Sequence, residues 1–132
     1  MNNFENNLLV PKETTDEMIE DVASKLGITF PEGYAEFILQ CNGYEGKVGS
    51  SYVRLWSIDD LEEANRGYNV AEFCDGLILF GSDGGGEAFG FDVRGKKIRF
   101  VEIPLITLDW MDAKFAGDSF KEFSRYLIER LK

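Results

Sequence analysis

Apolar residues recur at helical spacing near the start of the chain, over residues 14–26. They fall on one face of a helix, at Met18, Ile19, Val22, Ala23 and Leu26. Thr14 and Glu17 have the spacing of an N-terminal capping box, and Gly27 suits the left-handed position that follows a helix. The pattern predicts a helix that begins near Thr14 and ends before Gly27.

Two further stretches show the same helical period. In the first, Pro31 opens the predicted helix, Asn42-Gly43 closes it, and the apolar positions are Tyr34, Phe37, Ile38 and Cys41. The second spans residues 118–131 and carries Phe120, Phe123, Leu127 and Leu131 on one face. Each stretch predicts a helix that packs one side against a core.

The middle of the chain shows strand patterns instead, since residues 52–56 and 87–92 alternate with a period of two and residues 77–80 form a continuous apolar run typical of a strand covered on both faces. Strands are predicted over residues 52–56, 77–80, 87–92 and 98–103, the last of them stopped by Pro104. The connecting segments are predicted as a flexible loop at 44–51, a short acidic helix at 59–63 that 65–69 breaks, and a glycine turn at 81–86. We could assign no element to residues 104–112.

The order of these elements predicts an α+β fold in a single domain that covers residues 1–132. A mostly antiparallel sheet of short strands would pack against the N-terminal helices and a C-terminal helix. Residues 1–13 are expected to form an irregular lead-in. The alternation within 87–92 places Phe89 and Phe91 on one face and small residues on the other, so another segment should approach that second face closely.

Composition excludes several classes of function. The 132 residues carry a net charge of −10 and include no histidine, which removes Ser-His-Asp and Cys-His catalysis and histidine-ligated zinc. The acidic balance opposes direct binding of nucleic acid or of an anionic surface. Cys41 and Cys74 are expected to be buried thiols of a reducing compartment. Without a basic leader or an apolar run of about 18 residues, we expect a soluble cytoplasmic protein.

Several segments together resemble the SUKH superfamily of Smi/Knr-like domains. The first is Phe30-Pro31-Glu32-Gly33-Tyr34, the second is Leu55-Trp56-Ser57-Ile58, the third runs through the glycine turn over 79–92, and the fourth begins at Ser119-Phe120. The resemblance extends over residues 14 to 131. It implies an α+β fold without known catalytic activity, and we expect no cofactor. Bacterial members are mostly immunity proteins that bind and block a toxin domain, whereas fungal relatives are regulatory adaptors in cell-wall assembly.

The glycine turn offers two chemical alternatives, and both are disfavoured. It lacks the Gly-Lys-Ser/Thr ending of a phosphate loop, and Asp83 and Glu87 flank it with negative charge. A carboxylate enzyme or metal site would need Asp83, Glu87 and Asp92 to converge, but in a regular strand Glu87 and Asp92 point to opposite faces. We therefore predict no catalytic residue and no metal ligand.

Charge is distributed unevenly along the chain. Residues 57–92 hold nine acidic residues and one basic residue, whereas residues 93–132 hold nine basic and six acidic residues. This asymmetry predicts a negative surface that either only aids solubility or docks a basic partner such as a nuclease toxin. The predicted contact acids are Asp59, Asp60, Glu62, Glu63, Asp83 and Glu87.

Affinity also requires apolar anchors within a polar rim. The predicted anchors are Tyr44, Tyr52 and Trp56, with core packing as the alternative for each and the favoured one for Trp56. The expected function is thus a protein-binding domain that occludes the active or substrate-binding surface of a cognate toxin. A regulatory adaptor without a toxin partner is the alternative, and the oligomeric state stays open.

Overall fold

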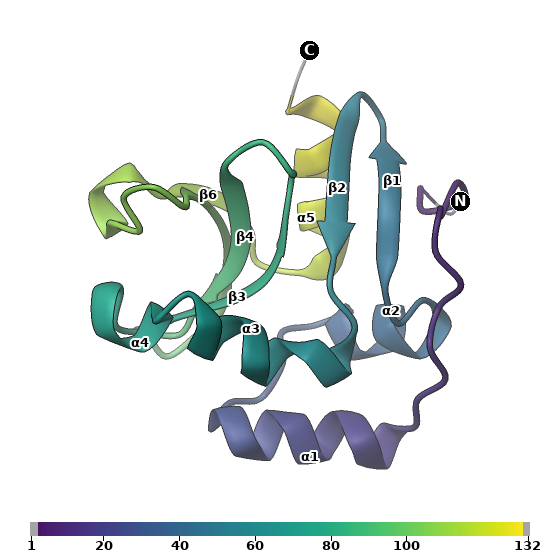
Figure 1. Ribbon diagram of the computed structural model, residues 1–132, viewed down its shortest axis with the longest axis horizontal. Coiled ribbons are helices and arrows are strands. Elements are labelled where there is room, and N and C mark those ends of the chain that lie inside the picture. Colours follow the sequence, from purple (N-terminus) through teal and green to yellow (C-terminus); the bar gives the residue numbers. More distant parts are fainter. Residues whose placement is uncertain (1–2, 131–132) are drawn as a thin grey trace.

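A computed structural model describes residues 3–130 of the chain (Figure 1). The helices are α1 (Asp16–Leu26), α2 (Tyr34–Gln40), α3 (Leu61–Gly67), α4 (Val70–Phe73) and α5 (Phe120–Glu129), with 3-10 turns η1 (Ile58–Asp60) and η2 (Trp110–Asp112). The strands are β1 (Tyr44–Val48), β2 (Ser51–Leu55), β3 (Leu77–Ser82), β4 (Glu87–Asp92), β5 (Arg99–Pro104) and β6 (Lys114–Gly117). The fold is α+β, as predicted.

The strands form one antiparallel sheet in which each strand pairs with its neighbours in the chain, in the order β1-β2-β3-β4-β5-β6. In Figure 1, α5 lies behind this sheet and α3 and α4 lie in front of it. Helix α1 packs at one end of the molecule, in contact with α2, η1 and α3.

Strand alternation divides the core between the two faces of the sheet. Phenylalanines of β3, β4 and β5 meet α2 and α5 on one face, and the stacked pair Phe100 and Phe123 has ring centroids 5.1 Å apart. The other face carries smaller side chains such as Ala88 and packs against α4 and Leu108. A Cβ added to Gly90 would lie 2.8 Å from the carbonyl oxygen of Ile78, but Ile78 belongs to β3, the paired neighbour of β4 in the sheet, so the predicted close approach of another segment to this face stays a prediction.

Two strands were missed by the sequence analysis. Residues 44–51, predicted as a flexible loop, instead form β1 and the turn of its hairpin with β2. Gly49 makes this turn possible, since its φ is +63° and a Cβ there would lie 2.9 Å from Cα of Ile128 in α5. Strand β6, which pairs with β5, was not predicted either.

Helix boundaries also differ from those predicted. The N-cap of α1 is Thr15, whose hydroxyl accepts a hydrogen bond from the Met18 amide, so the predicted capping role of Thr14 is wrong. Helix α2 begins at Tyr34 rather than at Pro31, and α3 continues to Gly67 through part of the segment predicted to break it. Gly27 ends α1 in the left-handed conformation, as predicted.

The segments near the two ends of the described chain agree in part with the predicted irregular lead-in and C-terminal helix. Residues 3–13 contain no helix or strand, and Ser119 caps α5 by accepting a hydrogen bond from the Glu122 amide. Leu131, the last position of the predicted apolar face, lies outside the described residues. Both cysteines are free thiols, with Cys74 buried and Cys41 partly buried. Within residues 3–130, no helix is long and apolar enough to cross a membrane.

Candidate functional site

The acidic residues of η1 and α3 project outward because their apolar neighbours are held in the core. Ile58 and Leu61 have no exposed surface, and the Ile58 amide donates a 2.7 Å hydrogen bond to Oδ1 of Asn42. This anchors the turn, so that Asp59, Asp60, Glu62 and Glu63 are all exposed. Their exposure agrees with a role in contacting a partner, which stays a prediction.

Helix α1 adds two carboxylates that the sequence analysis did not include. Glu17 and Asp21 lie across from Asp59 and Glu62 in a groove of about 540 Å³ between α1 and the η1–α3 segment. Lys25 lines the same groove and pairs with Asp21 at 3.3 Å. We call this the acidic groove. Only tertiary packing brings the two segments together, although the 17, 21, 25 spacing on one side of α1 was a usable signal.

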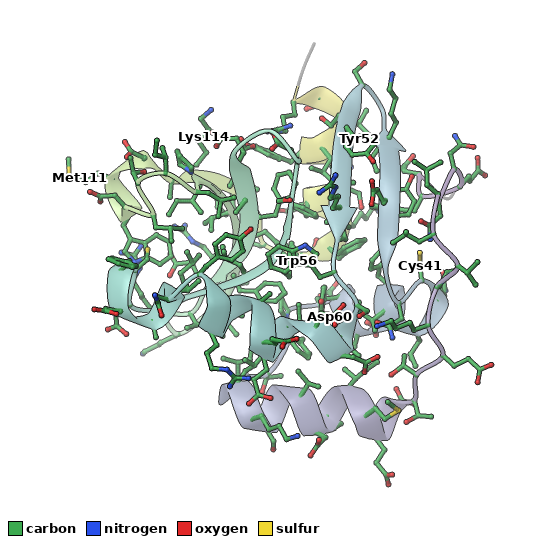
Figure 2. All side chains as sticks on the ribbon, viewed as in Figure 1. Cys41, Tyr52, Trp56, Asp60, Met111 and Lys114 are labelled. Atoms are coloured by element: carbon green, nitrogen blue, oxygen red, sulfur yellow. The ribbon has the colours of Figure 1, made fainter. Side chains whose placement is uncertain are left out.

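Two of the three predicted aromatic anchors lie on the outer face of β2 and directly beyond its end. Tyr52, Arg54 and Trp56 occupy alternate positions in the sequence and therefore point to the same side. Figure 2 shows both aromatic side chains. The Tyr52 hydroxyl donates a hydrogen bond to Glu45 in β1, and Arg54 pairs with the same carboxylate at 3.5 Å. Both aromatic side chains remain partly exposed.

Trp56 lines a second pocket, separate from the acidic groove. Its ring stacks on Tyr68 at the end of α3, with centroids 6.3 Å apart. The pocket measures about 290 Å³ and is walled by Trp56, Asp60, Leu9 and Val10, among others. We call it the Trp56 pocket. Asp60 lines the Trp56 pocket, and the preceding residue, Asp59, lines the acidic groove.

The third predicted anchor, Tyr44, is a core residue. It has no exposed surface, packs edge-on against Phe4 with centroids 5.1 Å apart, and donates a hydrogen bond to the Lys47 carbonyl at 2.8 Å. The strand period explains this, because β1 places Tyr44, Gly46 and Val48 on the face that α2 and α5 cover. In this conformation no partner can reach the Tyr44 side chain.

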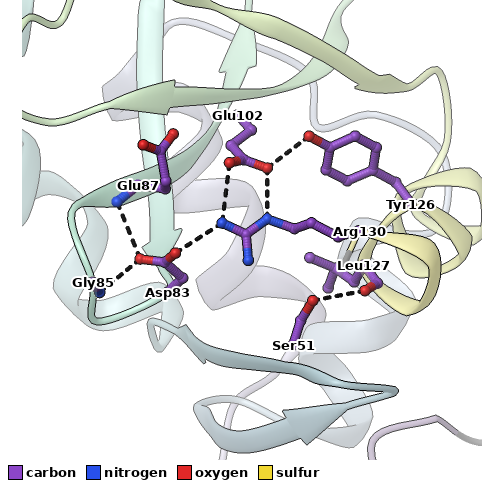
Figure 3. Close-up of polar contacts among 8 residues, drawn as sticks. All are labelled: Ser51, Asp83, Gly85, Glu87, Glu102, Tyr126, Leu127 and Arg130. Atoms are coloured by element: carbon purple, nitrogen blue, oxygen red, sulfur yellow. Dashed lines mark hydrogen bonds and ion pairs between the residues drawn. The ribbon is translucent and has the colours of Figure 1, made fainter. Parts of the chain in front are cut away.

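Asp83 and Glu87 are separated from the acidic groove, at the β3–β4 turn on the other side of the molecule (Figures 1 and 3). The Asp83 carboxylate accepts hydrogen bonds from the Gly85 and Glu87 amides and from Arg130, the residue that follows α5, the last at 2.8 Å. The predicted acidic face therefore divides into two groups of carboxylates. One is open to solvent, and the other is engaged in contacts within the protein.

Arg130 is the centre of this second group (Figure 3). Its guanidinium donates hydrogen bonds to both oxygens of Glu102, at 2.7 and 3.0 Å, and its side chain is only 10% exposed. The Tyr126 hydroxyl donates a further 2.6 Å bond to Glu102. Burial is the largest single influence and tends to raise the pKa of Asp83 and of Glu102, but the hydrogen bonds and charge of Arg130, together with the other hydrogen bonds to each carboxylate, outweigh it and hold each pKa below its ordinary value.

Glu87 shows the opposite behaviour. Burial raises its pKa, and the nearby Glu102 carboxylate raises it further. The two carboxylates line one hollow, but both oxygens of Glu102 already accept hydrogen bonds from Arg130. Asp92 lies on the opposite face of β4, where Arg94 binds it at 3.0 Å. The three carboxylates that a hydrolase or metal site would need are thus divided between two faces.

The two cysteine thiols and the possible metal ligands are the remaining groups that could carry chemistry. Burial raises the pKa of both thiols, Cys41 and Cys74, which disfavours the nucleophilic thiolate. Among residues 3–130, no three acidic or cysteine side chains are grouped so that they could hold a metal ion. The acidic groove and the Trp56 pocket, in contrast, are open to solvent.

Comparison with known proteins agrees with the resemblance noted in the sequence. The model of the SMI1/KNR4 family (SUKH-1) matches residues 13–125. The chain is also 40% identical over 63 residues to YnaB of Bacillus subtilis strain 168, which is described as an uncharacterized protein. That alignment covers 48% of this chain and 40% of YnaB, so less than half of either protein is compared.

Proposed function

The chain belongs to the SMI1/KNR4 family (SUKH-1), and from this premise we propose that it is a non-enzymatic protein-binding domain that neutralises a toxin. In this proposal it acts in the cytoplasm as an immunity protein. It binds a cognate bacterial toxin domain and occludes the active or substrate-binding surface. The family is generally non-catalytic, and the bacterial proteins that the sequence resembles are mostly of this immunity type.

The observation that carries the proposal is the acidic groove. Four carboxylates from two separate segments, Glu17 and Asp21 of α1 with Asp59 and Glu62 of η1–α3, face one hollow that contains a single lysine. Repulsion among these charges is unfavourable for the isolated protein. A basic partner relieves it, and a nuclease must carry a basic surface in order to bind nucleic acid. The carboxylates of the groove would then bind the toxin surface that otherwise binds the phosphate backbone of nucleic acid.

Two carboxylates that bind Arg130, Asp83 at the β3–β4 turn and Glu102 in β5, support the non-enzymatic part of the proposal. General acid–base catalysis needs a carboxyl group that can reach substrate and exchange a proton. Glu102 is 3% exposed and bound by Arg130 and Tyr126, while Asp83 is bound by Arg130 and two backbone amides. These contacts tie α5 to the sheet, which is a structural role.

The test is a growth-rescue experiment with the toxin domains encoded beside this protein in its own genome. Each domain is expressed in a sensitive bacterium with this chain, and we expect one of them to be neutralised. The variant with Asp59, Asp60, Glu62 and Glu63 all changed to Lys should rescue growth poorly. The control variant changes four exposed acids elsewhere, Glu36, Glu72, Asp112 and Glu129, to Lys, so both variants have the same net charge.

Three outcomes would contradict the proposal. Rescue of no neighbouring toxin, together with stable binding to an endogenous host protein, would favour the regulatory adaptor. Equal rescue by both variants would show that the acidic groove is not the docking surface. Turnover of a small substrate that Glu87→Gln abolishes in the folded protein would replace the binding function with an enzymatic one.

A further inference from the structure

The N-terminal segment 7–12 follows the outer edge of β1, and we call it the strap. Its backbone is fixed at two points, where the Leu8 amide donates to the Glu45 carbonyl at 2.8 Å and the Lys12 amide donates to the Asn42 carbonyl at 3.0 Å. Gly46 permits this close approach, because a Cβ there would lie 2.5 Å from the carbonyl oxygen of Asn6. Figure 1 shows the strap passing beside β1.

The strap is held in place but exposes consecutive aliphatic side chains. Leu8, Leu9 and Val10 are 71%, 45% and 92% exposed. Single exposed apolar residues are common, but here three follow one another on a segment whose backbone is hydrogen-bonded at two points. Just upstream, Phe4 is 8% exposed and packs against Phe37 with centroids 4.8 Å apart, so the strap is anchored in the core on that side as well.

The exposed strap is continuous with the Trp56 pocket. Leu9 and Val10 line one part of the pocket and Trp56 lines another. Asn42 also lines it and is 1% exposed, and among the described residues its Nδ2 atom has no hydrogen-bond acceptor. This buried amide is an unsatisfied polar group in the pocket wall.

We propose that the strap and the Trp56 pocket together receive an apolar side chain from a basic segment of the partner protein. This inference rests on the proposed function and specifies where the partner is anchored. Leu9, Val10 and Trp56 contact the inserted side chain. Basic residues that flank it in the partner face Asp60 and the acidic groove. An apolar anchor within a charged rim is the usual arrangement of an interface hot spot.

Charge identifies the partner's chemistry. The pocket's own ion pairs, Lys12 with Asp60 at 3.8 Å and Arg54 with Glu45 at 3.5 Å, are balanced, but the acidic groove has four acids and one base. An acidic segment would therefore be repelled. A second copy of this chain is also disfavoured as the occupant, because each copy carries a net charge of −10.

The experiment is an NMR titration of the full chain with three capped synthetic peptides. The probe has the sequence Lys-Lys-Gly-Leu-Gly-Lys-Lys, one control replaces its Leu with Ser, and the other replaces its four Lys with Glu. The probe should shift the backbone amides of Leu9 and Val10 and the indole N–H of Trp56. Both controls should bind at least about tenfold more weakly, since one lacks the anchor and the other the charge.

Matched variants decide where the probe binds. Leu9→Ser with Val10→Ser alters only exposed or half-exposed side chains and should weaken binding of the probe by about tenfold. Met111→Ser is the control, because Met111 is 90% exposed on the far side of the molecule (Figure 2). Absence of shifts, shifts confined to other surfaces, or self-association that depends on the strap would each overturn the inference. Growth rescue that persists in the strap variant would overturn the inference while leaving the immunity function intact.

Discussion

Arg130, one residue beyond α5, binds both carboxylate oxygens of Glu102 in β5, at 2.7 and 3.0 Å. The side chains are 10% and 3% exposed, so this fork-to-fork contact is made almost entirely out of water. The guanidinium also lies 5.4 Å from the ring centre of Phe89. The pair thus fixes the end of α5 against the sheet, and several consequences can be measured.

Arg130→Ala should lower the free energy of unfolding by about 3–5 kcal/mol, because it leaves the Glu102 carboxylate buried without its cation. Urea unfolding monitored by circular dichroism gives this value. Lys25→Ala is the control, since the pair with Asp21 is more than half exposed and should contribute almost nothing. A loss in Arg130→Ala no larger than in the control would mean that Arg130 does not stabilise α5.

The same cluster predicts a dependence of stability on pH. The pKa values of Asp83 and Glu102 are lowered in the folded protein, so their contribution is present above the unfolded-state value of about 4 and is lost as the pH falls below it. Thermal unfolding between pH 7 and pH 3 should show this loss. It should be smaller in Arg130→Ala, because Arg130 makes the hydrogen bond that contributes most to lowering each of the two pKa values.

Glu87 should act in the opposite direction. Its pKa is raised in the folded protein, so any stability from its neutral form is present at low pH and is lost as the pH rises through the folded-state value. Glu87→Gln should therefore stabilise the protein at pH 7, with an advantage that shrinks toward pH 4. Glu129→Gln, which removes a charge from the rim of the same hollow, is the control. An unchanged or lower stability at pH 7 in Glu87→Gln would contradict this assignment.

Changing Asp59, Asp60, Glu62 and Glu63 together to Lys should slow association with the neutralised toxin by about tenfold or more at low salt. The difference should diminish as salt is added, because screening acts on the long-range attraction that steers the encounter. Stopped-flow fluorescence over a range of salt concentrations measures both effects. Association of the control variant, in which Glu36, Glu72, Asp112 and Glu129 are changed to Lys, should be slowed much less. Equal rates for the two variants would show that net charge, rather than the groove, determines association.

Sequence patterns predicted those parts of the fold in which local signals and tertiary packing agree. The apolar faces of α1 and α5 and the alternation in β4 are local, and all three elements formed. Strand β1 was missed because Gly46 and Gly49 were taken as signs of a loop. They are required instead by the close approach of Asn6 and Ile128, which lie far away in the sequence.

The candidate site was predicted less completely, for a similar reason. The exposure of Asp59 and Glu62 followed from local pattern, but their juxtaposition with Glu17 and Asp21 depends on how α1 packs. Asp83 could not be assigned to an internal contact, because its cation, Arg130, is 47 residues away in the sequence. Tyr44 was misplaced once β1 had been taken for a loop, since only strand alternation directs it inward.

Asn65 links the acidic helix α3 to the sheet, and its replacement tests whether this link positions the surface. Its Nδ2 atom donates to the Leu79 carbonyl at 2.9 Å and to the Leu61 carbonyl at 2.8 Å, and its Oδ1 atom accepts from the Leu79 amide at 2.7 Å. Asn65→Ala leaves the Leu79 groups unpaired beneath α3 and should cost about 1–3 kcal/mol in urea unfolding. Asn65→Asp should cost a similar amount, because it keeps the acceptor but places negative charge against two carbonyls. The control for both Asn65 variants is Glu63→Ala, on the exposed side of α3.

Amide exchange at Leu79 should accelerate in both Asn65 variants and not in the control. Unchanged exchange would show that α3 is held by its apolar contacts alone.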